Sequence, residues 1–435
     1  MIPKPYYQDA HVTLYCGDCV ATMKTMPDNS VDSIVTDPPY GLGFMGKGWD
    51  ATVPGVEVWI ECLRILKPGG HLLAFAGTRT QHRMACAIED AGFEIRDMIA
   101  WVYGSGFPKS LDVSKAIDKA AGAEREVVGI RKLTGTARIK GQAAFGATSG
   151  RSDDAYQDGS EINDTLNITA PATEAARQWQ GWGTALKPAL EPITMARKPL
   201  GEKTVAANVL EYGTGGINVD GCRVGTEERF NPPRTKGETV ALGSFSMCDG
   251  NGSTVTGRWP ANLIHSHSPE CICTGVKRVK GSGWAQSGSK ASDNKSMSGG
   301  NYARDPKPDA FADSFGYETV ESYNCIEGCP VRLLDEQSGE DCFGDTGGAS
   351  RFFYTAKADK SERRQSKHPT VKPLDLIRYL VRMVTPEGGV VLDPFLGSGT
   401  LCEAARAEHC LSIGIELDAA YCADAVERLR QGVLF

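Results

Sequence analysis

The sequence has no long apolar run and no uniform excess of positive charge. No stretch approaches the roughly 18 consecutive apolar residues that a membrane-spanning helix needs, and residues 1–18 contain no apolar core of a secretory signal. We therefore expect a cytoplasmic protein with no membrane partner. The formal net charge of −7 argues against a uniformly basic coat for nucleic acid, although a local basic face is enough for such binding.

Disulfides are also not expected. In a cytoplasmic chain, the 14 cysteines are more consistent with free thiols and metal ligands. The length of 435 residues allows two domains, or one core with a large insertion.

Two parts of the chain show the alternation of strand and helix that is typical of α/β proteins. They are residues 11–101 and the residues from 373 onward, where short apolar runs alternate with amphipathic segments. Between residue 110 and about residue 366, glycine, serine and threonine dominate instead. Because neither α/β part has enough strands for a doubly wound sheet, we expect the two parts to combine into one sheet.

The first motif is VDSIVTDPPYGLGF, residues 31–44. Its apolar run predicts a buried strand that ends before Asp37, because proline cannot continue a hydrogen-bonded ladder. Asp37, Pro38, Pro39 and Tyr40 are therefore expected at the carboxyl end of a strand. That is where ligands bind in open α/β sheets.

The second motif is VVLDPFLGSGT, residues 390–400. Gly397 and Gly399 allow a tight turn and a close approach of the backbone to a ligand, and the helix that follows offers free N–H groups. Glu416 ends the next predicted strand, where an acid suits the two hydroxyls of a ribose. A nicotinamide-dependent oxidoreductase is an alternative, but the G-x-G-x-x-G spacing of dinucleotide sites is absent.

Together the two motifs resemble the paired signature of the S-adenosylmethionine-dependent DNA amino-methyltransferases, which methylate adenine at N6 or cytosine at N4. Their order, with the catalytic tetrapeptide first, resembles the β class. The resemblance implies an α/β fold, a Rossmann-like methyltransferase sheet with a large irregular target-recognition insertion. Residues 1–110 would form the catalytic part, residues 111–365 the insertion and residues 366–435 the cofactor-binding part.

The resemblance gives the tetrapeptide a chemical role. The lone pair of an exocyclic base amine is delocalised into the ring, so the amine is a poor nucleophile. The carboxylate of Asp37 and the carbonyl of Pro38 would accept the two amine hydrogens and direct the lone pair at the methyl group. Pro39 would keep the turn rigid, and Tyr40 would stack on a base flipped out of the duplex. No catalytic metal is needed.

The resemblance also implies contacts with the cofactor. Asp18 and Phe395 would meet the adenine ring of S-adenosylmethionine, Asp393 its methionine amino group, and Glu416 its ribose. The full set of expected cofactor-binding residues is Asp18, Asp37, His368, Thr370, Lys372, Asp393, Phe395, Gly397, Gly399, Thr400 and Glu416.

The first tetrapeptide residue bears on the target base. In the family, Asp at this position is more typical of N6-adenine enzymes and Ser of N4-cytosine enzymes, so Asp37 favours adenine and leaves N4-cytosine as the alternative. A protein or RNA amine methyltransferase would usually have Asn there. A catalytically inactive DNA-binding module is a further alternative.

The middle of the chain contains a group of histidines and cysteines, in HSHSPECIC and NCIEGCP. Two close pairs separated by a long loop are a plausible arrangement for a structural zinc ion, and unrelated reduced thiols explain the pattern about equally well. The expected ligands are His267, Cys271, Cys325 and Cys329, with His265 and Cys273 as substitutes.

Basic stretches indicate where double-stranded DNA could bind, although most charge runs are simply solvated surface. The expected contacts are Lys109, Lys277, Arg278, Lys280, Arg304, Arg351 and Lys367. From the resemblance we also expect a homodimer. No segment resembles a nuclease, which leaves a separate cognate endonuclease open.

Overall fold

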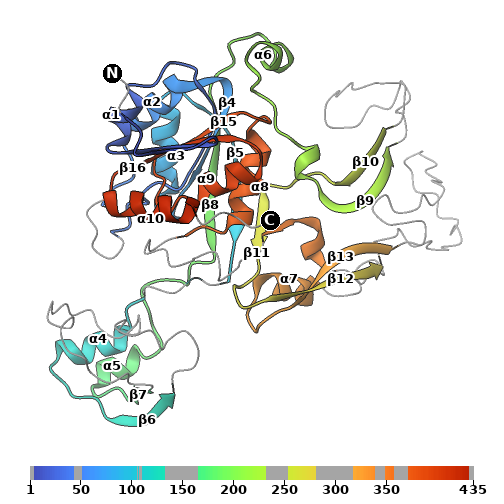
Figure 1. The fold of residues 1–435 in the computed structure, drawn as a ribbon. Helices are drawn as coiled ribbons and strands as arrows, with labels where there is room; N and C mark the ends of the chain where they lie inside the picture. The colour runs from blue at the N-terminus through green and yellow to red at the C-terminus, as the bar shows by residue number, and fades with distance from the viewer. Residues whose placement is uncertain are drawn as a thin grey trace, which may run out of the picture. The chain divides into compact units, whose positions relative to one another are not determined.

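The computed structural model describes residues 4–43, 51–104, 106, 110–132, 165–231, 253–280, 317–338, 348–356 and 371–430. The chain divides into two compact units (Figure 1). One combines Met1–Gly104 with Leu190–Phe435, and the other is Ser105–Ala189. None of the helices in the described ranges is long and apolar enough to cross a membrane.

The first unit is built on one mixed sheet. The strands of this sheet are, in spatial order, β1 (Tyr7–Gln8), β2 (Val12–Cys16), β16 (Leu411–Glu416), β15 (Val390–Asp393), β3 (Val31–Thr36), β4 (Leu66–Phe75), β8 (Leu190–Arg197), β5 (Glu94–Val102), β11 (Leu263–Ser266) and β14 (Tyr354–Ala356). Strands β1 and β8 run antiparallel to their neighbours, and the other strands pair in parallel.

The two α/β parts of the sequence combine into this sheet, as expected. Strand β15, from the C-terminal part, pairs with β3 of the N-terminal part through Val391 with Ser33 and Leu392 with Ile34. On its other side β15 pairs with β16. The strand order therefore reverses between β15 and β3, and in α/β proteins such a reversal is where ligands bind.

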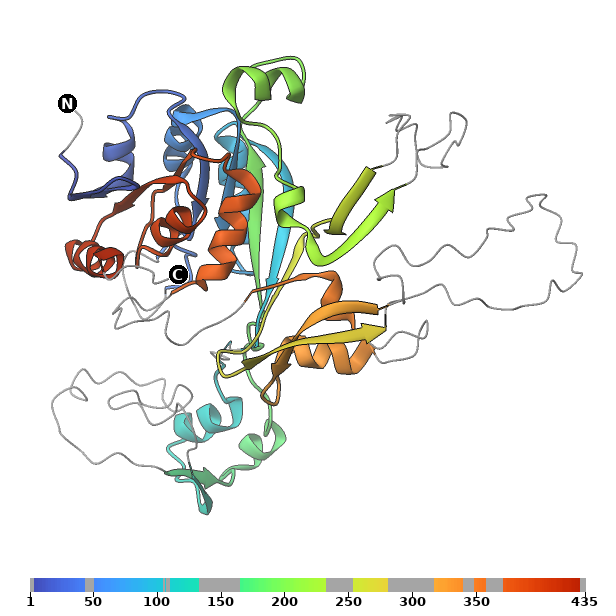
Figure 2. The same ribbon diagram turned by 45° about the vertical axis from the view of Figure 1, so that its right-hand side comes forward.

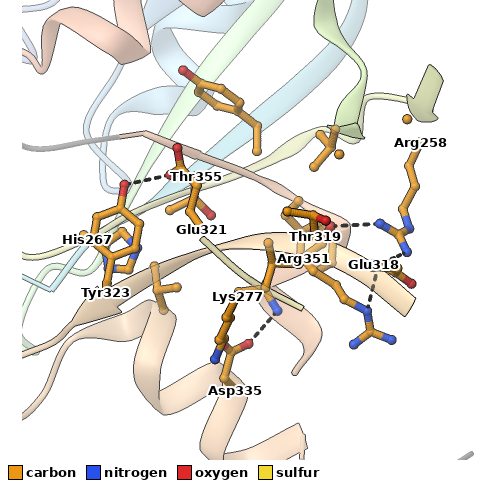
Figure 3. A pocket seen from close by; sticks show the side chains of 18 of the residues that line it. Arg258, His267, Lys277, Glu318, Thr319, Glu321, Tyr323, Asp335, Arg351 and Thr355 are labelled. Carbon is orange, nitrogen blue, oxygen red and sulfur yellow. Dashed lines mark hydrogen bonds and ion pairs between the residues drawn. The ribbon is translucent and has the colours of Figure 1, made fainter. Parts of the chain in front are cut away.

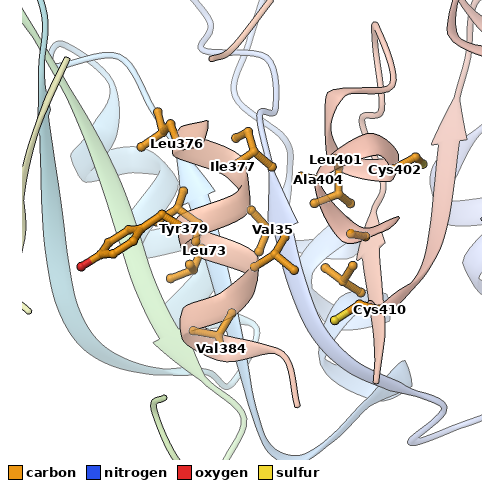
Figure 4. Packing of buried hydrophobic residues seen from close by; sticks show 14 of the residues in the cluster. Val35, Leu73, Leu376, Ile377, Tyr379, Val384, Leu401, Cys402, Ala404 and Cys410 are labelled. Atoms are coloured by element: carbon orange, nitrogen blue, oxygen red, sulfur yellow. The ribbon is translucent and has the colours of Figure 1, made fainter. Parts of the chain in front are cut away.

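Helices cover both faces of the sheet. The helices on one face are α8 (Leu374–Val384), α9 (Thr400–Ala407) and α10 (Ala419–Arg430), and those on the other face are α1 (Cys19–Met23), α2 (Val56–Ile65) and α3 (Gln81–Asp90). The neighbours Ile34 and Val35 belong to different hydrophobic clusters because successive side chains of a strand point to opposite faces. Figure 4 shows Leu376 and Val384 of α8 packed on the Val35 face.

The middle of the chain differs from the single insertion expected for residues 111–365. Strands β8, β11 and β14 come from this region and lie in the main sheet. The segment Ser105–Ala189 forms a separate compact unit. Strand β8 enters between β4 and β5 and is antiparallel to both. Long-range hydrogen bonds fix the position of β8, and no pattern in the local sequence predicts it.

The remaining elements are hairpins and short helices (Figures 1 and 2). In the first unit they are α6 (Val205–Tyr212), the 3₁₀ turns η5 (Asp220–Cys222) and η6 (Ala349–Phe352), the hairpin of β9 (Val224–Asn231) and β10 (Ser253–Arg258), the hairpin of β12 (Ile272–Lys280) and β13 (Tyr317–Asn324), and α7 (Pro330–Ser338). In the unit Ser105–Ala189 they are α4 (Val113–Ala120), α5 (Glu174–Gln178) and the hairpin of β6 (Val127–Lys132) and β7 (Thr165–Thr169).

Candidate active site

The tetrapeptide that begins at Asp37 follows directly after the fully buried strand β3. The next residue after Tyr40, Gly41, has φ +66°, and a Cβ there would lie 2.8 Å from the backbone nitrogen of Val53. The hydroxyl of Thr80 donates a hydrogen bond of 2.6 Å to the carbonyl of Tyr40. The strand fixes one end of the tetrapeptide, and this turn and hydrogen bond fix the other.

Four side chains form a polar network around the tetrapeptide. Asp37 accepts hydrogen bonds of 2.7 Å from the Tyr40 hydroxyl at Oδ1 and from Lys372 Nζ at Oδ2. Glu191 Oε2 lies 2.8 Å from the Tyr40 hydroxyl and 3.3 Å from Lys372 Nζ. The single hydroxyl proton of Tyr40 can be donated to only one of the two carboxylates at a time, so the Lys372 ammonium is the donor that both carboxylates share.

Burial and charge set the protonation of the two donors. Burial raises the pKa of Tyr40 well above its usual value, and the nearby charges of Asp37 and Glu191 raise it further. Burial alone would lower the pKa of Lys372, but the same two carboxylates outweigh it and hold the pKa above its usual value. At neutral pH the network therefore contains a neutral phenol and a charged ammonium between two acids.

Asp393 connects the second motif, residues 390–400, to the tetrapeptide. Its side chain is buried, and Oδ1 accepts hydrogen bonds of 2.6 Å from the Thr36 hydroxyl and 3.0 Å from the Phe395 amide. Thr36 is the residue immediately before Asp37. Burial raises the pKa of Asp393 to about 7, although both hydrogen bonds oppose the shift.

The glycine turn has the backbone geometry that the sequence predicts. Gly397 has φ +55° and Gly399 has φ +81°, conformations that residues with a Cβ rarely adopt. Glu416 holds the turn because its Oε2 accepts a hydrogen bond of 2.9 Å from the Gly397 amide. Its Oε1 accepts one of 2.8 Å from the amide of Asp418. Glu416 at the end of β16 is thus hydrogen-bonded directly to the glycine turn after β15.

Comparison with known proteins assigns the chain to a family. The DNA methylase family (N6_N4_Mtase) matches residues 31–120 and 284–427, which is more than half of the sequence. The chain belongs to this family. The two matched regions contain the tetrapeptide and the glycine turn, so the DNA methylase signature coincides with the site described above.

Two relatives match over shorter stretches. The type II methyltransferase M.HpaI of Haemophilus parainfluenzae is 31% identical over 116 residues, which are 24% of this chain and 36% of the relative. The type II methyltransferase M.BamHI of Bacillus amyloliquefaciens is 39% identical over 80 residues, 17% of this chain and 19% of the relative. The chain therefore matches about a third or less of the length of these relatives.

Two solved structures are similar at low sequence identity. The PvuII DNA methyltransferase (cytosine-N4-specific) has a TM-score of 0.40 at 13% identity, covering 98% of this chain and 88% of that one. The M1.HpyAVI complex with SAM has a TM-score of 0.36 at 14% identity, covering 96% and 99%.

Most of the expected cofactor-binding residues of this family member lie along one edge of the sheet. Parallel strands have their carboxyl ends at the same edge, which brings together the residues after β2, β3, β15 and β16. After β2, Asp18 caps α1 by accepting a hydrogen bond of 2.8 Å from the amide of Ala21. Lys372 reaches the edge through Asp37. His368 and Thr370 lie outside the described residues.

No motif in the sequence points to Glu191. Because β8 is antiparallel, its beginning lies at the edge where its parallel neighbours end, and Glu191 is its second residue. The local sequence offers only an acid between Pro188 and Pro192, ahead of an apolar run. That signal does not indicate a partner at Tyr40.

A second missed residue is Arg428 of α10. Its side chain is buried and pairs with Glu403 at 2.7 Å. It also donates a hydrogen bond of 3.0 Å to the hydroxyl of Thr400, next to the glycine turn. Arg428 therefore stabilises the loop of residues 394–400, here called the cofactor loop, from the side of α10.

The four expected metal ligands lie together. Their nitrogen and sulfur ligand atoms, one from each residue, are all within 4.8 Å of one another. The two residues expected as substitutes have other surroundings: the ring of His265 lies 5.4 Å from that of Phe353, and Cys273 is exposed.

The expected DNA contacts divide into three groups. Lys277, Arg278 and Lys280 are exposed on β12. Lys109, Arg304 and Lys367 lie outside the described residues. Arg351 contradicts the expectation, because its side chain is buried.

Arg351 is held inside the protein by its neighbours. Its Nε lies 3.4 Å from Glu318 Oε2, and Arg258 approaches the same carboxylate to 2.7 Å, as Figure 3 shows. The Arg351 guanidinium also lies 4.3 Å from the centre of the Phe352 ring. Arg351 lines the pocket drawn in Figure 3 together with Arg258 and Glu318, and these contacts give it a structural role there.

Proposed function

We propose that this chain is a site-specific DNA methyltransferase that transfers a methyl group from S-adenosylmethionine to the N6 amine of an adenine flipped out of duplex DNA. The observation that carries the proposal is the hydrogen bond between Thr36 and Asp393, which brings the tetrapeptide and the glycine loop to one point. Membership of the DNA methylase family supports the same chemistry.

The residues at the sheet edge fit the cofactor. S-adenosylmethionine carries an ammonium group, a ribose diol and a flat adenine ring, and when bound it supplies an electrophilic methyl group. The buried carboxylate of Asp393 would pair with the ammonium, and Glu416 would accept hydrogen bonds from the diol. Phe395 and Asp18 would meet the adenine. A pairing cation would also keep the Asp393 carboxylate ionised despite its burial.

Asp37 would act on the substrate amine. With the carbonyl of Pro38 it would accept the amine hydrogens and hold the lone pair toward the methyl group. Each carboxylate oxygen can accept a further hydrogen bond beyond those from Tyr40 and Lys372. Those two donors fix the orientation of Asp37 before substrate arrives, so the carboxylate needs no rearrangement to stabilise the positive charge that develops on the amine.

Adenine is proposed because the tetrapeptide begins with Asp37. In the resemblance described above, Asp at this position is more typical of N6-adenine enzymes than of N4-cytosine enzymes. Cytosine N4 is the alternative, and the test below distinguishes the two bases directly.

The test is single-molecule sequencing of DNA from a methylation-free host that expresses this chain, with Asp37→Ala as the inactive control. We expect N6-methyladenine in one short sequence motif, and none with the variant. N4-methylcytosine in such a motif would replace the proposed target base. Unmodified DNA from cells with soluble, cofactor-binding protein would overturn the proposal in favour of an inactive DNA-binding module. Light scattering of the purified chain tests the expected homodimer.

A further inference from the structure

The four residues that lie together in the middle of the chain mark the ends of four elements. His267 follows β11 and Cys271 precedes β12. Cys325 follows β13 and Cys329 precedes α7. The cluster therefore sits where the chain leaves the main sheet, at the base of the β12–β13 hairpin.

The spacing of the ligand atoms fits a tetrahedral metal ion. His267 Nδ1 lies 3.4 Å from Cys325 Sγ and 3.5 Å from Cys329 Sγ. Around a tetrahedral zinc ion, with its usual bond lengths, a nitrogen and a sulfur ligand are roughly 3.6 Å apart. The sulfur of Cys271 also lies within 4.8 Å of the other three ligand atoms. The side chains need little movement to bind an ion between them.

The backbone around the cluster is shaped to present the sulfurs. Two tight turns close on the cysteines, with hydrogen bonds of 2.9 Å from the Cys271 amide to the Ser268 carbonyl and 3.3 Å from the Cys329 amide to the Ile326 carbonyl. Each turn holds its cysteine in place, because the amide of that cysteine closes the turn.

The histidine is also held in place. Its ring stacks on that of Tyr323 of β13, with 3.7 Å between the ring centres and 25° between the planes, and both residues are labelled in Figure 3. The side chain of His267 is buried. A stacked, buried imidazole is fixed in orientation, as a metal ligand must be.

The hairpin has little apolar core of its own. Along β12, eight of the nine residues are exposed and only Val279 is buried. Apolar burial therefore does little to fix the base of this hairpin, and a metal ion would supply the missing stability.

We propose that His267, Cys271, Cys325 and Cys329 bind a structural zinc ion that ties the base of the β12–β13 hairpin to β11 and α7. Three thiolates and one imidazole in tetrahedral spacing are a donor set typical of zinc. Four protein ligands leave no open position for a substrate, so the ion stabilises the fold and takes no part in catalysis. The site does not depend on the proposed methyl transfer.

The first test is metal analysis of the tag-free full-length chain, purified under reducing conditions and washed with chelator. We expect one equivalent of zinc per chain. Replacing zinc with Co²⁺ should give the visible absorption of a tetrahedral site and a thiolate-to-cobalt charge-transfer band. Reduced protein that contains no zinc and binds no Co²⁺ would overturn the proposal, whether or not the chain methylates DNA.

Three variants assign the ligands. Cys325→Ser should lose the bound zinc or weaken Co²⁺ binding by at least about tenfold. Cys273→Ser is the matched control, since this thiol lies on the same hairpin and is exposed. The Cys273→Ser variant should retain one full equivalent of zinc per chain. If Cys325→Ser does not fold, His267→Cys keeps the proposal testable: it should bind one Co²⁺ with a stronger charge-transfer band, from four thiolates instead of three. Full metal binding by Cys325→Ser, or loss of metal in Cys273→Ser, would contradict the assignment.

Discussion

The hydroxyl of Tyr40 and the carboxylate of Glu191, from residues 151 positions apart, are 2.8 Å from each other. Glu191 also lies 3.3 Å from Lys372, which in turn is hydrogen-bonded to Asp37. An acid contributed by the antiparallel strand β8 thus completes a network around a tetrapeptide contributed by β3. The orientation of Asp37 depends on residues from three separate parts of the chain.

Removing the charge of Asp37 should stop catalysis and spare cofactor binding. In Asp37→Asn one of the two carboxylate partners of Lys372 is lost and the acceptor for the substrate amine is weakened, so we expect the rate of methyl transfer to fall by at least about 100-fold. Single-turnover methyl incorporation into DNA measures the rate, and calorimetry measures the affinity for S-adenosylmethionine. Asp90→Asn, at an exposed position at the end of α3, is the control and should behave as the wild type. Near-normal turnover by Asp37→Asn would rule out its proposed role.

Glu191 is expected to act as a positioning residue. Glu191→Gln retains an acceptor for Tyr40 and removes one of the two charges that raise the pKa of Lys372, so that pKa should fall. We expect kcat to drop by roughly tenfold, a typical effect of losing a charged hydrogen bond, with KM for the cofactor unchanged. The loss of activity at alkaline pH should begin at a lower pH than in the wild type.

Glu202→Gln is the matched control for this experiment, because Glu202 is exposed and lies a few residues after the end of β8. If Glu191→Gln had the same kcat as the wild type and lost activity at the same alkaline pH, the network would not need the carboxylate of Glu191.

Cofactor binding should be linked to proton release from Asp393. The pKa of this buried carboxyl is about 7, and only its ionised form can pair with the cofactor ammonium. At pH 6 binding should therefore release about 0.9 proton and at pH 8 about 0.1, and affinity should rise about tenfold between the two. Calorimetry in buffers of different ionisation enthalpy measures the protons, and Asp393→Asn should abolish the linkage.

The same shift affects the stability of the cofactor-free protein. The folded-state pKa of Asp393 lies above the usual carboxyl value, so between about pH 4 and pH 7 the folded state binds more protons than the unfolded state. The contribution of Asp393 to stability is therefore complete below this window and is lost as the pH rises through 7. Comparing the free energy of unfolding of wild type and Asp393→Asn across this range checks the sign. If the free energy of unfolding of the wild type rose relative to that of Asp393→Asn as the pH increases, the predicted direction would be wrong.

Breaking the buried pair of Arg428 and Glu403 should destabilise the fold and loosen the cofactor loop. Arg428→Met removes the buried cationic partner of the Glu403 carboxylate, which is expected to cost about 3–5 kcal/mol in the free energy of unfolding. The double variant with Glu403→Met should cost clearly less, since both charges of the buried pair are then removed. Urea denaturation measures both. Arg83→Met, at an exposed position on α3, is the control.

The double variant also separates stability from binding. Arg428 donates a hydrogen bond to Thr400 in the cofactor loop, and this contact is missing in both the single and the double variant. We therefore expect both variants to bind S-adenosylmethionine more weakly than the wild type. Wild-type affinity in the double variant would show that Arg428 serves the fold alone.

Local patterns were sufficient to predict the strands and loops that carry the chemistry. An apolar run followed by Asp37 and two prolines has to end a strand, and the two glycines of the second motif have to form a turn. Because these signals depend on backbone sterics and periodicity, they can be recognised from the sequence alone. The two histidine and cysteine motifs likewise predicted four residues that the structure brings together.

Only the tertiary structure decided how distant segments meet. The pairing of β15 with β3, the entry of β8 between β4 and β5, and the position of Glu191 depend on long-range hydrogen bonds that no local pattern encodes. The burial of Arg351 follows in the same way from its neighbours Glu318 and Phe352, which a count of charges along the sequence cannot show. The sequence determined which chemical groups this protein has, and the packing of the chain determined which of them act together.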